Sequence, residues 1–132
     1  MTTVDKANNF VIVVERRMTQ VYKTLSLIGN LSNTRYYEYS DEEVNELFFK
    51  LLDKGNEIKR FFVEYSNSRT EIYEKKRNLS ASFHFSSPKL GNEKNDNFRT
   101  IAESRVSKVF GTMNSIANTA YKPNYDYTNQ QI

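Results

Sequence analysis

Basic residues gather at a few places along the chain, and one basic run is followed by two aromatic residues. The segment KKRNLSASFHF begins at Lys75 and ends at Phe85. Cations grip phosphates and aromatic rings stack on bases, so this combination is typical of proteins that bind nucleic acid. Glu71 and Glu74 dilute the positive field, and a solvated helix end is therefore the alternative interpretation. The residues predicted to contact nucleic acid or a partner are Arg16, Arg17, Lys75, Lys76, Arg77, Phe83, Phe85, Arg105 and Lys108.

Two of these arginines occupy matching positions in similar stretches of sequence. Arg17 lies seven residues after Phe10, and Arg105 lies seven residues after Phe98. They could form two related contact points for an acidic ligand, phosphate included. The alternative is structural, in which Arg17 pairs with an acid of a neighbouring helix.

Residue patterns typical of catalysis are missing. The chain has no cysteine, which excludes disulfides, thiolate zinc sites and cysteine nucleophiles. Its four glycines are not clustered into a phosphate-binding loop. The only histidine, His84, is interpreted as a surface or edge residue, and the acids Asp41–Glu43 suit the first turn of a helix. We therefore predict no enzyme, no catalytic residue, no metal site and no cofactor.

The elements that position these residues are predicted from apolar spacings of three and four, which indicate amphipathic helices. The first stripe predicts a helix over 8–31 and consists of Val11, Val14, Met18, Val21, Leu25 and Ile28. The second predicts a helix over 40–65 and consists of Val44, Phe48, Leu51, Gly55, Ile58 and Phe62, widened by Leu47, Leu52 and Phe61. The third predicts a helix over 98–119 and consists of Ala102, Val106, Val109, Met113 and Ile116. Ser40 and Glu43 predict a capping box at the start of the second helix.

The chain resembles itself when it is shifted by 88 positions, which takes Asn9 to Asn97. Ten of the 32 positions from Asn9 to Ser40 are then identical, and no gap is needed. We predict a repeat unit over 9–96 and a shortened second unit over 97–132. In the second unit Thr128 takes the place of the Ser40 cap and is followed by Gln131, while Tyr127 and Ile132 take the places of Tyr39 and Val44.

The connector 66–96 is the least regular part of the sequence. RTEIYEKKRNL is either a third short helix or an extension of the second helix. SASFHFSS alternates between apolar and polar residues and predicts a short strand, and SPKLGNEKNDN predicts a loop. The predicted fold is a single domain over 1–132, mostly α: an αα-hairpin, a third long helix that repeats the first, and a short β-like or irregular connector.

Composition narrows the function without identifying it. The net charge is +3 with a pI near 9.0, which permits contact with nucleic acid without requiring it. No stretch approaches the length of a membrane span, and the cytoplasm is the expected compartment. The leading hypothesis is a small non-enzymatic protein of a bacterial mobile element that binds nucleic acid and acts as a regulator. The alternative is an inhibitor or adaptor that binds a protein partner, and a third is a homo-oligomer in which another chain completes the shortened unit.

Overall fold

A computed structural model describes residues 2–121, 128 and 131–132. Over these residues the chain forms four helices and no strand, so the prediction of a mostly α fold is confirmed. The helices are α1 (Thr3–Gly29), α2 (Asp41–Glu64), α3 (Arg69–Lys76) and α4 (Glu93–Ile116). Short 3₁₀ turns extend α1 over Asn30–Ser32 and α4 over Ala117–Ala120.

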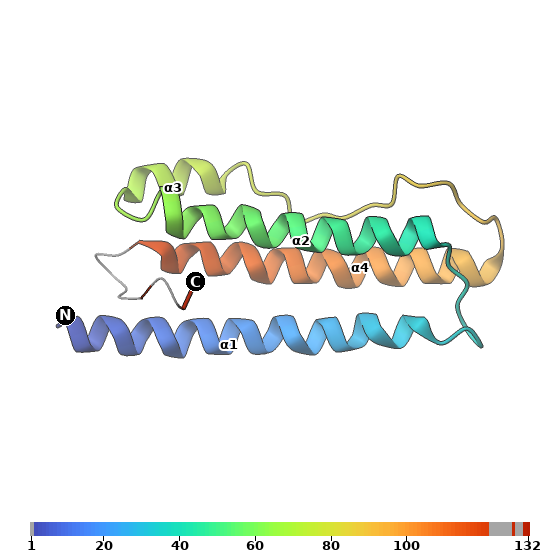
Figure 1. The fold of residues 1–132 in the computed structure, drawn as a ribbon, viewed down its shortest axis with the longest axis horizontal. Helices are drawn as coiled ribbons and strands as arrows, with labels where there is room; N and C mark the ends of the chain where they lie inside the picture. Colours follow the sequence, from blue (N-terminus) through green and yellow to red (C-terminus); the bar gives the residue numbers. More distant parts are fainter. Residues whose placement is uncertain (1, 122–127, 129–130) are drawn as a thin grey trace.

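Helix α4 is the element on which the other long helices assemble. It runs antiparallel to α1 and parallel to α2, and α1 and α2 lie along it (Figure 1). The backbones of α1 and α2 hardly approach each other. The predicted αα-hairpin is therefore wrong in one respect: α1 and α2 are consecutive and antiparallel, but each packs mainly on α4.

The core follows the apolar stripes of α1 and α4. On α4 the predicted inner face is confirmed, because Ala102, Val106 and Val109 are fully buried. On α1, Val21 and Ile28 are buried, Val14, Met18 and Leu25 are partly buried, and Val11 is exposed. The stripe of α2 is only half right, since Phe48 is 59% exposed and Leu52 is 66% exposed. The buried side of α2 instead carries Leu47, Ile58 and Phe61.

Side-chain caps fix where the helices begin. The Ser40–Glu43 capping box is present, with the Glu43 N–H donating to Ser40 Oγ at 3.1 Å. A second capping box, between Thr2 and Asp5, starts α1 five residues before the predicted position. Asn92 caps α4, so the polar run that was predicted as a loop contains the first turn of that helix.

The connector between α2 and α4 contains α3 and then an extended segment. This segment forms no backbone hydrogen bonds of a β-sheet with the rest of the described chain. The N–H of Phe83 donates to Ser107 Oγ at 2.8 Å, and that of Phe85 donates to a Glu103 carboxylate oxygen at 2.8 Å. Two residues of extended chain advance about 6.6 Å, and four residues of helix advance about 6 Å. Alternate amides therefore match successive turns of α4. The predicted strand is wrong, but the alternating residues Phe83 and Phe85 do face α4.

No helix within the described part of the chain is both long enough and apolar enough to cross a membrane.

Candidate functional site

The basic residues near α3 are held by the protein's own side chains. Lys75 Nζ lies 5.7 Å from the centre of the Tyr65 ring, and the Arg77 guanidinium lies 5.9 Å from that of Tyr73. Lys76 donates to the side-chain carbonyl of Asn118, just past the C-terminal end of α4. Aromatic rings and helix C-terminal ends both favour cations. Lys75 and Arg77 nevertheless remain exposed.

The two matching arginines make matching contacts between α1 and α4. Arg17 on α1 donates to the backbone carbonyl of Ser115, in the last turn of α4. Arg105 on α4 donates to the backbone carbonyl of Leu27, in the last turn of α1, at 2.6 Å. Each guanidinium donates to a backbone carbonyl at the C-terminal end of the other helix, where a cation is favoured. Arg17 therefore pairs with a carbonyl of α4 rather than with an acid.

The aromatic pair of the connector faces inward. Phe83 is buried, which corrects the expectation that it is exposed for stacking. Phe85 is partly buried, with its ring 5.8 Å from that of Phe98 and 5.2 Å from the Arg99 guanidinium. Arg16 and Lys108 are exposed. The nine predicted contact residues therefore do not share one environment, because some are exposed and others are engaged within the fold.

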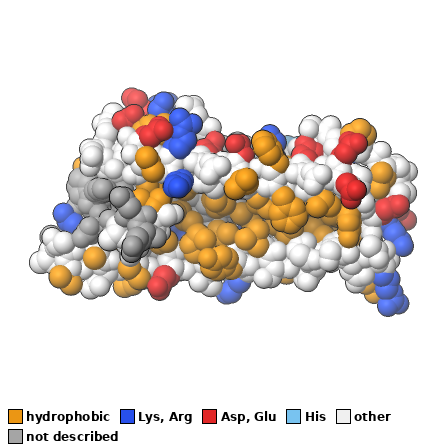
Figure 2. Space-filling model, viewed as in Figure 1, with side chains coloured by type: hydrophobic (Ala, Val, Ile, Leu, Met, Phe, Trp, Pro, Cys, Tyr) orange, Lys and Arg blue, Asp and Glu red, His pale blue; other side chains and the backbone are white. Residues whose placement is uncertain are grey.

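A different feature stands out between α1 and α2. Hydrophobic side chains form a continuous band along this face of the molecule, between the two helices (Figure 2). We call this feature the α1–α2 groove. It contains two hollows, which we name the Leu25 hollow and the Phe10 hollow after residues that line them.

The Leu25 hollow lies at the end of the groove where α1 ends and α2 begins. Its volume is about 360 Å³, and its lining is almost entirely apolar. Tyr39 closes part of it, with its ring 5.2 Å from that of Phe98. The side chains that define the hollow are Leu25, Ile28, Val44, Leu47, Phe48 and Phe98.

The Phe10 hollow lies toward the other end of the groove. Its volume is about 320 Å³, and all three long helices contribute to its lining. The chain's own Gln131 and Ile132 also reach it. Lys59 is its one cationic side chain among the described residues. The apolar side chains that define it include Phe10, Val14, Met18, Tyr22, Met113 and Ile116.

Sequence reasoning found the residues of this groove but assigned them to the core. Phe48 and Leu52 continue the apolar stripe of α2, and such a stripe normally faces the rest of the fold. The described chain leaves them exposed because α2 turns its other apolar residues toward α4. The apolar stripe of α2 is wider than one neighbouring helix can cover. This width was the signal in the sequence that part of the stripe would stay exposed.

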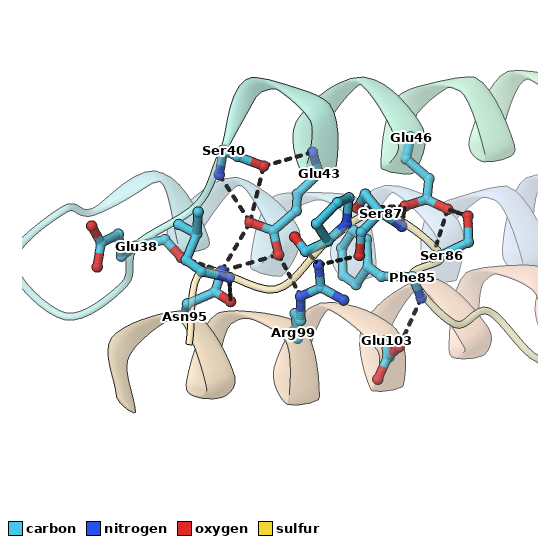
Figure 3. A network of polar contacts seen from close by, with 12 residues as sticks. Glu38, Ser40, Glu43, Glu46, Phe85, Ser86, Ser87, Asn95, Arg99 and Glu103 are labelled. Atoms are coloured by element: carbon cyan, nitrogen blue, oxygen red, sulfur yellow. Dashed lines mark hydrogen bonds and ion pairs between the residues drawn. The ribbon is translucent and has the colours of Figure 1, made fainter. Parts of the chain in front are cut away.

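A buried polar network holds α2 to α4 (Figure 3). The Glu43 side chain is 0% exposed, and Arg99 Nε donates to its Oε2 at 2.5 Å. Asn95 Nδ2 lies 2.8 Å and 3.0 Å from its two oxygens. Arg99 also donates to the backbone carbonyls of Ser87 and Pro88. Glu43 is thus the point at which α2, α4 and the connector meet.

A second carboxylate anchors the connector to α2. Glu46 accepts hydrogen bonds from the hydroxyl and the backbone N–H of both Ser86 and Ser87, at 2.5 to 3.1 Å. Burial alone would raise the pKa of Glu46. The four hydrogen bonds to the charged form outweigh burial and lower its pKa from 4.5 to about 2. Both carboxylates are therefore used to build the fold.

Metal-binding clusters and the surroundings of His84 were the remaining places where chemistry could occur. The described residues contain no group of three His, Asp or Glu side chains placed to hold a metal ion. His84 is exposed, with its ring 3.7 Å from a carboxylate oxygen of Glu103. A polar hollow of about 320 Å³ lies beside it, lined by the opposite charges of Lys50, Asp53 and Glu57 among others.

No family model, no curated protein and no solved structure matches this chain.

Proposed function

We propose that this protein binds a protein partner through the α1–α2 groove and acts as an inhibitor or adaptor by occluding a surface of that partner. The observation that carries the proposal is the groove itself, a band of apolar side chains left uncovered between two helices. Contiguous apolar patches on a small protein are costly to expose and typically mark interaction sites. Aromatic residues such as Tyr22 and Phe48 in the groove are of the types that dominate binding energy at interfaces.

Binding of nucleic acid has weaker support. Nucleic-acid sites combine accessible cations with accessible aromatic rings. Here Phe83 is buried, and Arg17 and Arg105 are engaged with helix carbonyls. The groove itself holds one cation, Lys59, among its described residues. A surface of that composition suits apolar protein side chains better than phosphates.

The test is a pull-down from the source cells with two matched variants of α2. Phe48 lines the Leu25 hollow, and its neighbour Phe49 is 63% exposed outside the lining of both hollows. Phe48→Asp should abolish capture of the partner, because a carboxylate would be buried in an apolar site. Phe49→Asp should leave capture intact. Circular dichroism and thermal melts should show that both variants fold.

Nuclease and salt separate the two hypotheses. The captured protein should remain bound after nuclease treatment and in high salt, because apolar contacts do not release counterions. Capture that is equal for both variants would remove the groove from the proposal. Retention that depends on nucleic acid and weakens steeply with salt would favour the nucleic-acid hypothesis instead.

A further inference from the structure

The two hollows of the groove are built from corresponding residues. A shift of 88 positions takes Leu25 to Met113 and Ile28 to Ile116. Leu25 and Ile28 line the Leu25 hollow, and Met113 and Ile116 line the Phe10 hollow. The same shift takes Phe10 to Phe98, and each phenylalanine lies in the opposite hollow from its counterpart. Residues of α1 and α4 that are related by the shift therefore line opposite hollows, so the two hollows are equivalent by this internal symmetry.

The arginine contacts obey the same exchange. Arg17 and Arg105 are related by the shift, and so are the carbonyls that they reach, which belong to Ser115 and Leu27. Two polar contacts on opposite helices thus agree with the correspondence of the apolar residues. α1 and α4 therefore present similar faces on the side where the groove opens.

Those faces are covered to very different extents. On α4, Ala102, Val106 and Phe110 are buried, and Phe110, whose ring lies 6.2 Å from that of Phe83 in the connector, is 6% exposed. Their counterparts on α1 are Val14, Met18 and Tyr22, and Tyr22 is 62% exposed. On α1, Val14 and Met18 are only partly buried, and Gln131 and Ile132 reach the same hollow from the end of the chain.

The last residues of the chain show how such a helix would begin. Ile132, the counterpart of Val44, lines the Phe10 hollow just as Val44 lines the Leu25 hollow. The Thr128 N–H donates to Gln131 Oε1 at 2.8 Å, as the Ser40 N–H donates to Glu43 Oε1 at 2.9 Å. Tyr127, the predicted counterpart of Tyr39, lies outside the described residues.

We infer that the partner's binding element is an amphipathic α-helix that lies in the α1–α2 groove parallel to α1, an inference that rests on the proposed function. It takes the place on α1 that α2 takes on α4, so it runs antiparallel to α2 and completes a four-helix bundle. Its first turns displace Gln131 and Ile132 from the Phe10 hollow, and its last turns fill the Leu25 hollow. Phe48 and Leu52 of α2 pack against its flank.

The residues of α1 that the partner's helix would contact determine which residues that helix can carry. Where α4 has Asn95 and Arg99 to receive Glu43, α1 has Ala7 and Val11. A carboxylate in that first turn would be buried without a donor, so the partner's helix carries an uncharged residue there. The α2 helix of a second copy is a poor occupant, because α4 of that copy already covers its inner side.

The probe is a synthetic peptide with the sequence of residues 40–65 and the change Glu43→Gln, labelled for fluorescence anisotropy. It should bind the intact protein saturably at 1:1 stoichiometry. Tyr22→Ser should weaken binding roughly tenfold, the loss expected for an aromatic contact at the centre of an interface. Tyr73→Ser on α3, which removes a tyrosine of similar exposure (66%), should leave binding unchanged. The unmodified peptide, with Glu43, should bind more weakly than the probe.

Orientation is tested by disulfide cross-linking, which is clean because the chain has no cysteine. Asn8 and Ser26 are exposed and lie 18 residues apart on α1, which is five full turns and therefore the same side of the helix. A cysteine at the peptide's N-terminus should cross-link to Asn8→Cys and not to Ser26→Cys. A cysteine at its C-terminus should show the reverse preference.

The outcomes separate this inference from the proposed function. A peptide that does not bind, or that binds equally to the Tyr22→Ser and Tyr73→Ser variants, overturns the helical occupant. The reverse cross-linking pattern overturns the orientation. Either result leaves partner binding standing if Phe48→Asp still abolishes capture. A protein that dimerises by light scattering and loses the dimer on Tyr22→Ser would show that a second copy is the occupant.

Discussion

The face of α4 that packs on α2 and the corresponding face of α1 differ in the residues that they present. On α4, a buried carboxylate, an amide and a guanidinium fix α2 in one position through directional hydrogen bonds. On α1, the corresponding surface is plain and apolar from Ala7 to Leu25. A buried ion pair is expensive to desolvate but defines register, whereas an apolar wall accepts any helix of suitable shape. The difference indicates a permanent junction on α4 and an exchangeable one on α1.

The connector sharpens this contrast. Glu103 and Ser107 of α4 accept backbone hydrogen bonds from the extended chain. Their counterparts on α1, Glu15 and Thr19, are exposed to solvent. The covered side of the molecule thus uses its polar groups internally, and the open side keeps them in water at the edge of the groove.

The largest effect is expected where the polar network is broken. Arg99→Ala leaves the fully buried Glu43 carboxylate without its cation, which should lower the free energy of unfolding by about 3–5 kcal/mol. The corresponding change on α1, Val11→Ala, should cost less than about 1 kcal/mol. Urea denaturation of both variants measures the difference. Similar losses for the two would contradict the contrast between the junctions.

A second pair of corresponding positions tests how far each face is covered. Phe110→Ala removes a buried ring that contacts Phe83, with centroids 6.2 Å apart, and should destabilise the fold by about 3 kcal/mol. Tyr22→Ala on the open face should change stability by no more than about 0.5 kcal/mol in the free protein. Thermal and urea unfolding provide the comparison. A large loss from Tyr22→Ala would mean that the groove is covered in solution.

The Ser40 cap of α2 should contribute more to stability than the corresponding turn at Thr128. Ser40→Ala removes the hydroxyl that accepts from the Glu43 N–H and should cost about 1 kcal/mol. At Thr128 it is the backbone N–H that donates to Gln131, so Thr128→Ala should change stability by less than about 0.5 kcal/mol.

The last prediction is a pH dependence of the connector. The folded-state pKa of Glu46 is about 2 and lies below its ordinary value of 4.5, so its ionisation stabilises the fold above pH 4.5. That contribution is lost as the pH falls from 4.5 toward 2. The stability difference between the wild-type protein and Glu46→Gln should therefore shrink through this window. A difference that stays constant with pH would show that the serine hydrogen bonds do not depend on the charge.

Local signals predicted much of the helical structure. The Ser40–Glu43 capping box located the start of α2 to the residue, and the spacing of Ala102, Val106 and Val109 identified the inner face of α4. The start of α1 was missed although the Thr2–Asp5 box is also a local pattern. Its residues precede the apolar stripe by two turns, so periodicity alone could not find it.

Tertiary contacts decided the features that the sequence did not reveal. The polar run after Gly91 reads as a loop, but Asn92 and Asn95 are recruited by Glu38 and Glu43, more than 50 positions away. Alternation in the connector reads as a strand, and side chains of α4 replace the strand partner. The groove was hidden for a related reason, because the pattern of Phe48 and Leu52 shows that a side is apolar but not which element covers it.

The central position of α4 has a consequence for how the protein is made. Helices α1, α2 and α3 leave the ribosome before α4, yet α1 and α2 have few contacts with each other. A nascent chain that ends before Glu93 therefore holds apolar stripes with no surface on which to pack. Cooperative folding must therefore wait until the last long helix emerges from the exit tunnel.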